Sequence, residues 1–305
     1  MTAAANPITP TRPAEAAAAH VATPTPSRRR RKLDPFRVLA FVILAVLALA
    51  WLVPVAWAVL TSLKTEAEAA AMPVTLVPDS GFTLSAYKET LSEGKVPRWA
   101  WNSLLTSSLV TAITVVISAL AGYALSRMTF TGRRLIITLT VASIMIPSQI
   151  LIVPLFKLML SLDLVDTYWG IILPQVVAAP MVFILMKFFD QIPKELEEAA
   201  LMDGASRLRI LWSIIVPLSR PILGAVAIFV FIGAWNNFLW PFIVINDADL
   251  MTLPVGLQTV ISAYGIQYAQ NMAQAVLAAL PLIVVFLFFQ RQIIKGISTT
   301  GIAGT

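Results

Sequence analysis

The chain contains no cysteine and a single histidine, His20. Without cysteine it can form neither a disulfide nor a thiolate metal site. His20 lies in a stretch rich in alanine, proline and threonine, whose composition predicts a solvated side chain rather than a catalytic base or a metal ligand. We therefore expect no metal site in this chain.

Charged residues are also scarce. Asp, Glu, Lys and Arg make up 12% of the 305 residues, whereas hydrophobic residues make up 58% and the mean hydropathy is +0.82. Soluble domains carry about 25% charged residues, so this composition excludes an ordinary soluble domain. The remaining charge is basic, with a net charge of +6.

Six segments stay free of charge for long enough to cross a hydrocarbon core, which takes about 20 helical residues. Their apolarity is continuous rather than alternating, which favours helices over a membrane barrel, because lipid offers the backbone no hydrogen-bond partner. The sequence thus predicts an all-α polytopic membrane protein with six transmembrane helices. The segments are Val38–Leu60, Trp101–Ser126, Leu135–Phe156, Thr167–Met186, Ile222–Ile245 and Met272–Phe289.

The basic residues are distributed unevenly among the loops. Lys and Arg are retained on the cytoplasmic side when they lie in short loops beside a span. With the N-terminus inside, 17 of the 22 basic residues are cytoplasmic, and the two later outer loops, 161–166 and 246–271, contain none. We therefore expect both termini to be cytoplasmic, and this pattern explains the basic charge without any binding of nucleic acid.

Residues 1–33 are predicted to be a disordered cytoplasmic tail, and residues 34–305 a single six-helix transmembrane domain. A cleaved secretory signal is the alternative interpretation of the first span. Its 23 uncharged residues exceed the usual apolar region of about 7 to 15 residues. The first span is therefore expected to be a retained anchor.

None of the 16 acidic residues lies inside a predicted span. Carriers driven by an ion gradient usually need an ionisable group near mid-membrane, so ion coupling is disfavoured. The spans also lack the nucleophile with a base, the metal cluster or the acid pair of a membrane enzyme. No Gly-x-x-x-x-Gly-Lys-Ser/Thr loop occurs in the chain, so any ATP that drives it must be hydrolysed on another chain.

A polar segment interrupts the second half of the chain between two apolar runs. Pro193 suits the first turn of a helix, and the glutamates after it place negative charge at the positive end of the helix dipole. Gly204 can adopt the left-handed conformation that ends a helix. The segment thus predicts a surface helix from about Pro193 to Asp203 and a second helix that begins at Ser206. A polar linker without any partner would have a similar sequence.

The residues of this segment resemble the EAA motif of ATP-binding-cassette (ABC) importer permeases. Glu198-Ala199-Ala200 is followed by Gly204 and then by Ile214 and Pro217 at the spacing of that motif. The chain from Val38 onward is similar to the carbohydrate branch of these permeases, of the maltose-permease G-type. The similarity is carried by 145–149, 166–175, 235–241, 252–257 and 289–292.

This resemblance implies a type I ABC importer permease fold in a bacterial inner (plasma) membrane. In the family, the loop that corresponds to 190–220 forms the coupling helix that docks on the ATPase. The implied partners are a cytoplasmic ABC ATPase dimer, a second homologous permease and an extracytoplasmic solute-binding protein. The chain itself would be no enzyme and would hold no cofactor, since ATP and Mg²⁺ bind the partner ATPase. The residues that the resemblance assigns to the ATPase contact are Glu198, Ala199, Ala200, Asp203 and Gly204.

Polar residues inside the predicted spans are the candidates for the translocation path, because a sugar needs hydroxyl partners and an apolar face on which to stack. Asn236 and Trp240 lie four positions apart in the fifth predicted span and are expected to share a face, with Asn237 beside them. The alternative for the amides is hydrogen bonding between neighbouring helices. The other candidates are Ser148, Gln149 and Gln175.

The sequence therefore predicts the membrane-spanning subunit of an ATP-driven, binding-protein-dependent importer of a sugar or oligosaccharide. The alternative within transport is a permease for glycerol phosphate or another polyol derivative, although a phosphate calls for a basic pore residue and the predicted spans contain none. The alternative outside transport is a membrane scaffold or enzyme that uses the polar segment only for docking. Selectivity among sugars is expected to be set mainly by the binding protein.

Overall fold

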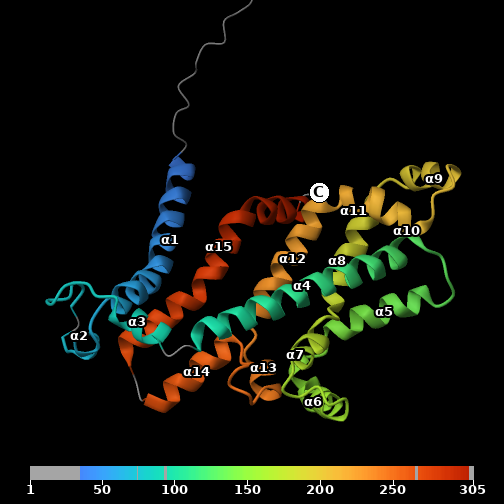
Figure 1. The fold of residues 1–305 in the computed structure, drawn as a ribbon. Coiled ribbons are helices and arrows are strands. Elements are labelled where there is room, and N and C mark those ends of the chain that lie inside the picture. The colour runs from blue at the N-terminus through green and yellow to red at the C-terminus, as the bar shows by residue number, and fades with distance from the viewer. Residues whose placement is uncertain (1–34, 74, 93–94, 265–266, 302–305) are drawn as a thin grey trace, which may run out of the picture. The chain divides into compact units, whose positions relative to one another are not determined.

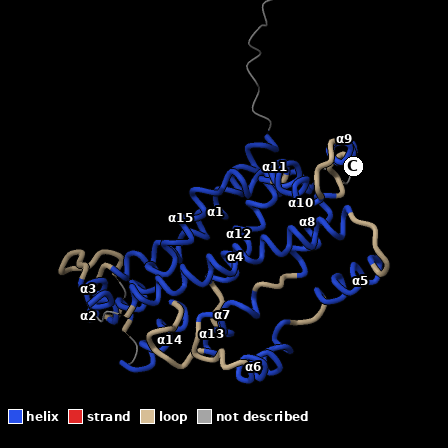
Figure 2. Tube along the Cα trace, turned by 45° about the vertical axis from the view of Figure 1, so that its right-hand side comes forward, coloured by secondary structure: helices blue, strands red, loops and turns tan. Residues whose placement is uncertain are grey.

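The structure, a computed structural model, describes residues 35–73, 75–92, 95–264 and 267–301. Over these residues the chain consists of helices and loops, with no strand (Figure 2). The predicted tail, residues 1–33, lies outside the described residues. The chain divides into two compact units, Met1–Trp51 and Leu52–Thr305. The contacts described below lie within the second unit.

Long helices alternate with short ones along the described chain (Figure 1). The three longest have 28, 32 and 34 residues. Two short 3₁₀ segments, η1 and η2, and one π-helical segment, η3, connect α-helices. The elements are α1 (Pro35–Ser62), α2 (Glu66–Ala70), α3 (Ser85–Ser92), α4 (Val96–Arg127), α5 (Arg133–Ile144), η1 (Ser148–Leu151), α6 (Ile152–Ser161), α7 (Tyr168–Ile172), η2 (Leu173–Gln175), α8 (Ala179–Phe189), α9 (Glu195–Met202), α10 (Arg207–Ile210), η3 (Leu211–Ile215), α11 (Val216–Leu218), α12 (Arg220–Trp235), α13 (Leu239–Val244), α14 (Leu253–Tyr264) and α15 (Tyr268–Gly301).

Three helices are long and apolar enough to cross a membrane: α1, α4 and the Tyr268–Phe288 part of α15. Three pairs of shorter helices meet the same requirement together but are bent at a break. The described residues thus contain three candidate spans, or six if each bent pair is one span, and the all-α polytopic prediction is confirmed. The bent pairs are Arg133–Ile144 with Ser148–Ser161 (97°), Tyr168–Gln175 with Ala179–Phe189 (47°) and Arg207–Leu218 with Arg220–Trp235 (84°).

Two of the predicted spans, 135–156 and 167–186, are bent at a break rather than formed by one continuous helix. The first breaks before η1, where Pro147 is extended with φ −60° and ψ 127°. The second breaks before α8, where Ala178 is extended and Pro180 lies in the first turn. Proline has no backbone N–H to donate and suits the start of a helix, which explains why a new helical segment begins beside each of these prolines.

The fifth predicted span, 222–245, also contains a break. α12 ends at Trp235, and the amide of Asn236 donates a hydrogen bond to the carbonyl of Ile232 at 3.0 Å. The helix resumes only at Leu239. Asparagine side chains compete in this way for backbone groups, so hydropathy alone did not reveal where the helix stops.

The second unit is packed around α4, which contacts α7, α8, α12 and α14. Figure 1 shows α9 and α10 near one end of α4 and α14 near the other. The packed face of α4 contains many small residues, which let neighbouring backbones approach closely. At Gly122 a Cβ atom would lie 3.1 Å from the backbone nitrogen of Met186 in α8. The buried small residues of α4 include Ser103, Ser107, Thr114, Ser118, Ala119 and Gly122.

The α14 end of α4 is fixed by a buried tryptophan. Trp99 is 2% exposed, and its Nε1 donates to the carbonyl of Ala248 at 2.7 Å. Its ring lies directly against Gly256 of α14, where a Cβ atom would come within 2.1 Å of a ring carbon. Only glycine leaves room for α14 to pack this closely on α4.

We expect Gly256→Ala to destabilise the purified protein by roughly 1–3 kcal/mol, the usual cost of overpacking. The Trp99 ring cannot move aside, because it is buried and hydrogen-bonded. Thermal unfolding in detergent measures the effect. Gly233→Ala is the matched control, since a Cβ there meets no atom within 4 Å. Equal melting temperatures for the two variants would contradict the close packing described.

Candidate functional site

The predicted surface helix is present at the α9 end of α4. α9 covers Glu195–Met202, close to the predicted bounds of Pro193–Asp203. Gly204 has φ +77° and so adopts the predicted left-handed conformation. The helix ends in a Schellman motif, in which the N–H of Ala205 donates to the carbonyl of Ala200 at 2.9 Å.

The second helix of the segment begins as predicted. The hydroxyl of Ser206 accepts a hydrogen bond from the N–H of Arg209 at 3.3 Å, which is an N-cap for α10. The chain continues through η3 and α11 and then turns by 84° into α12. The polar segment thus connects the surface helix directly to a long helix of the membrane domain.

One side of α9 faces outward. Most residues that the resemblance assigns to the ATPase contact lie on this side, and the most exposed apolar side chain of α9, Met202, is 89% exposed. A groove of about 250 Å³ runs beside it and is lined in part by Asp203 and Arg209. The surface is therefore free, within the described chain, to receive another protein. Of the assigned residues, Glu198, Ala199, Asp203 and Gly204 are exposed and Ala200 is partly exposed.

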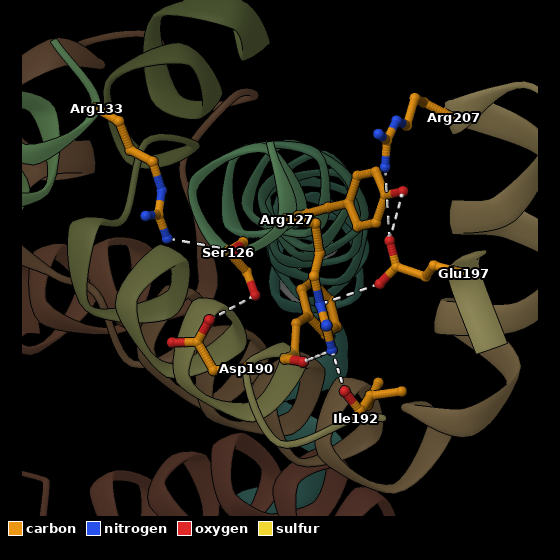
Figure 3. Close-up of polar contacts among 9 residues, drawn as sticks. Ser126, Arg127, Arg133, Asp190, Ile192, Glu197 and Arg207 are labelled. Atoms are coloured by element: carbon orange, nitrogen blue, oxygen red, sulfur yellow. Dashed lines mark hydrogen bonds and ion pairs between the residues drawn. The ribbon is translucent and has the colours of Figure 1, made fainter. Parts of the chain in front are cut away.

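The inner side of α9 holds a buried ion pair. Oε1 of Glu197 lies 3.0 Å from Nε of Arg127, the last residue of α4, and these side chains are 6% and 3% exposed (Figure 3). Nη2 of Arg127 also donates to the backbone carbonyls of Phe189 and Ile192, at the end of α8. One guanidinium therefore joins α4, α8 and α9.

Two further groups contact the Glu197 carboxylate. Its Oε2 accepts a hydrogen bond from the hydroxyl of Tyr123 at 3.3 Å and lies 3.9 Å from the guanidinium of Arg207. A buried charge is costly unless it is paired and hydrogen-bonded, and this carboxylate is both. In the sequence alone, Glu197 is only one of several acidic residues near the positive end of a helix dipole. The one sequence feature that could have indicated a partner for Glu197 is Arg127, the basic residue that directly follows the second predicted span.

A second candidate site is a cavity of about 450 Å³. Its polar lining comes from the three helix breaks, at η1, at η2 and between α12 and α13. Non-helical backbone at membrane depth is tolerated where it lines a cavity, which explains why the helix breaks lie around this one. The cavity collects five of the six predicted path residues: Ser148, Gln149, Gln175, Asn237 and Trp240.

The sixth predicted path residue, Asn236, does not line this cavity. The expectation that Asn236 and Trp240 share a helix face is wrong, because α12 ends at Trp235 and α13 begins at Leu239. Trp240 is 7% exposed, and its Nε1 donates to the carbonyl of Gly170 at 3.0 Å. It therefore forms part of a packed wall.

The polar groups of the cavity are neutral. The amide of Asn237 donates to Oε1 of Gln175 at 2.7 Å, and the amide of Gln175 donates to the carbonyl of Ile171 at 2.8 Å. Phe229 and Trp240 add aromatic surface, and none of the lining residues is charged. In the described part of the chain, no group of His, Cys, Asp or Glu side chains is placed to hold a metal ion. The cavity suits a neutral molecule with hydroxyl groups.

At the opposite end of α4 from α9, Asp166 ties two loops together. Its Oδ1 accepts hydrogen bonds from the N–H groups of Asp247, at 3.0 Å, and Asn246. Its own N–H donates to the carbonyl of Val244 at 3.0 Å. The bonds from Asp247 and Asn246 hold the pKa of Asp166 below its ordinary value, because they stabilise the ionised carboxylate.

The same loop region is bonded to α4 itself. Asn102, which is buried, donates to the carbonyls of Asp249 and Met251 at 2.9 Å each. Its Oδ1 accepts from the hydroxyl of Tyr168 at 2.8 Å. The N-terminal part of α4, α7 and the loop before α14 are therefore held as one assembly.

The fold and these two sites define a multi-pass membrane protein of the transport class. Residues 114–299 match the family of the binding-protein-dependent transport system inner membrane component. The chain belongs to this family, which agrees with the predicted resemblance. Members are translocating components rather than enzymes, lie in the bacterial inner membrane and work with ATPase and binding-protein subunits.

Several relatives match most of the chain. The arabinooligosaccharides transport system permease protein AraQ of Bacillus subtilis is 33% identical over 91% of this chain and 99% of its own length. The trehalose/maltose transport system permease protein MalG of Thermococcus litoralis is 35% identical over 88% of this chain and 97% of its own length. The sn-glycerol-3-phosphate transport system permease protein UgpE of Yersinia pestis is 35% identical over 64% of this chain and 70% of its own length.

A solved structure shares the fold. A chain of a bacterial ABC transporter involved in the import of the acidic polysaccharide alginate has a TM-score of 0.76 and 24% identity, covering 88% of this chain and 99% of that chain. The predicted ABC importer permease fold is confirmed.

We expect Asp166→Asn to lower stability most at neutral pH. The depressed pKa means that the carboxylate contributes stability above its unfolded pKa of about 4, and that this contribution is lost as pH falls through the lower folded value. Melting temperatures of wild type and variant, measured from neutral pH down to about pH 3, should therefore converge on acidification. A difference that stays constant with pH would contradict the assignment.

Proposed function

We propose that this chain is a permease subunit of an ATP-driven, binding-protein-dependent importer of a sugar or oligosaccharide. The observation that carries the proposal is the cavity lined by neutral amide and hydroxyl groups beside aromatic side chains. Sugars are bound by such combinations, since their hydroxyls need hydrogen-bond partners and their apolar faces stack on rings. Relatives named for arabinooligosaccharides and for trehalose or maltose support this substrate class.

In this proposal both termini and α9 are cytoplasmic, as the distribution of basic residues predicts. The exposed side of α9, with Glu198, Ala199 and Ala200 at its centre, docks on a cytoplasmic ABC ATPase dimer. Asp203 and Gly204 complete the contact. ATP and Mg²⁺ bind that partner and drive its closure.

A second homologous permease would supply the other half of the pore. An extracytoplasmic binding protein would deliver the sugar to the loops around Asp166 and Asp249. Alternating access then exposes the cavity to each side in turn, and the three breaks that line it provide places where helices can bend. Ser148, Gln149, Gln175 and Asn237 would contact the passing sugar.

Import of glycerol phosphate is the alternative, because UgpE is among the relatives. A phosphate calls for a basic partner, and no lining residue of the cavity is charged. Vesicles reconstituted with this chain, its partner permease, the ATPase and the binding protein distinguish import of a sugar from import of glycerol phosphate. We expect ATP-dependent uptake of radiolabelled arabinotriose, maltose or trehalose and none of glycerol 3-phosphate. The reverse result would overturn the substrate class.

Asn237→Ala should reduce uptake in these vesicles by roughly threefold to tenfold, the effect of losing one hydrogen bond to a neutral group. The control is Asn236→Ala, because Asn236 lies outside the cavity lining and bonds only its own helix end. Both complexes should keep the bound ATPase. Equal uptake by the two variants would argue against a path along Asn237.

Ala199→Trp should abolish co-purification of the ATPase without unfolding this chain, because Ala199 is exposed and a small residue there permits close approach. Ala199→Ser is the matched control, since it keeps the residue small and should retain the ATPase. Affinity purification from detergent extracts, with the melting temperature as a folding check, measures the outcome. Retention of the ATPase by the Trp variant would show that docking occurs elsewhere.

A further inference from the structure

α9 is attached to the membrane domain in an unusual way. Of its eight residues, the buried one is Glu197, whereas the apolar Leu196, Leu201 and Met202 are 44%, 37% and 89% exposed. Apolar burial by this helix is therefore slight. The side-chain attachment of α9 to the rest of the unit depends mainly on one carboxylate.

We propose that Arg127 and Glu197 act as positioning residues, a clasp that makes α9 move as one body with α4 and α8. This inference rests on the proposed function, in which α9 receives the motion of the ATPase. Without the clasp, the short connection between α8 and α9 would absorb that motion. With it, a displacement of α9 is passed to the ends of α4 and α8.

The chemistry of the pair suits this role. A guanidinium is planar and offers several donors in fixed directions, so Arg127 can bind Glu197 and two backbone carbonyls of the α8 end at the same time. An apolar contact would allow α9 to slide. In this ion pair each partner is also hydrogen-bonded to other groups, Arg127 to the carbonyls at the end of α8 and Glu197 to Tyr123, so its position is restricted. Tyr123 and Arg207 restrict the carboxylate further.

The helices that the clasp joins also reach the cavity. Met181 of α8 and Val110 of α4 line the cavity, and the two helices end at Phe189 and Arg127 beside α9. A displacement imposed at the clasp is therefore transmitted along continuous helix to the cavity wall. α9 itself contributes no residue to the cavity lining.

The first test compares transport with ATP hydrolysis in the reconstituted complex. Glu197→Gln keeps the shape of the side chain and removes its charge, and we expect ATP hydrolysis to continue while sugar molecules moved per ATP fall by about tenfold. The sugar is the one among arabinotriose, maltose and trehalose that the unaltered complex takes up. Glu195→Gln, an exposed change on the same helix, should leave the ratio unchanged.

A second variant removes the effect of an unpaired buried charge. Arg127→Met combined with Glu197→Leu leaves no charge to bury and is expected to fold and to bind the ATPase, because apolar replacement of a buried pair is often tolerated. If the clasp transmits the motion, this folded complex should hydrolyse ATP but move as few sugar molecules per ATP as the Glu197→Gln complex. A ratio equal to that of wild type would overturn the proposal.

A distance measurement tests the rigid-body motion directly and needs no sugar. The chain has no cysteine, so Glu195→Cys on α9 and Lys187→Cys on α8, both exposed, can carry spin labels. In the complex with cysteine-free partners, we expect one narrow distance distribution, the same without nucleotide and with ATP and vanadate. Adding Glu197→Gln should broaden it and make it nucleotide-dependent.

The outcomes separate the two proposals. If the unaltered complex shows no ATP-dependent uptake, the proposed function fails. If the unaltered complex transports and the clasp variants match it in the transport ratio or in the distance distribution, only the clasp fails.

Discussion

Close packing along α4 is the constraint on which the second unit depends. Its buried face carries small residues, and Gly122 leaves so little space that the backbone of α8 lies almost against that of α4. In a membrane the association of helices cannot rely on the exclusion of water, so such contacts and hydrogen bonds supply much of the adhesion. The polar clusters around Asn102 and Arg127 then fix what surrounds the two ends of this helix.

The broad organisation followed from composition, because long uncharged runs in a chain with few charges have one stable solution in lipid. The surface helix was also predictable, since Pro193 and Gly204 mark its bounds by local backbone chemistry. The exact positions of the helix breaks were harder to predict from the sequence. Hydropathy reports where a segment lies and not where its backbone bends, and so the assumption of continuous helix placed Asn236 and Trp240 on one face.

The two sites differ in how much of them the sequence indicated. Most of the polar residues of the cavity were found, because an amide or hydroxyl inside an apolar run is conspicuous. Their grouping depends on the helix breaks and could not be inferred. The pairing of Arg127 with Glu197 joins residues far apart in the chain, and among neighbouring glutamates nothing local distinguishes the one that is buried.

The length of α4 has a mechanical consequence. A helix of 32 residues is about 48 Å long. If it behaves as a rod pivoting near one end, a tilt of only about 5° carries the other end through about 4 Å, more than the length of a hydrogen bond. Because its ends are fastened to the loops around Asn102 and to the helix that holds Glu197, a small rotation of α4 would carry these attached elements with it. A movement of several ångströms at one end therefore requires no large deformation of the core.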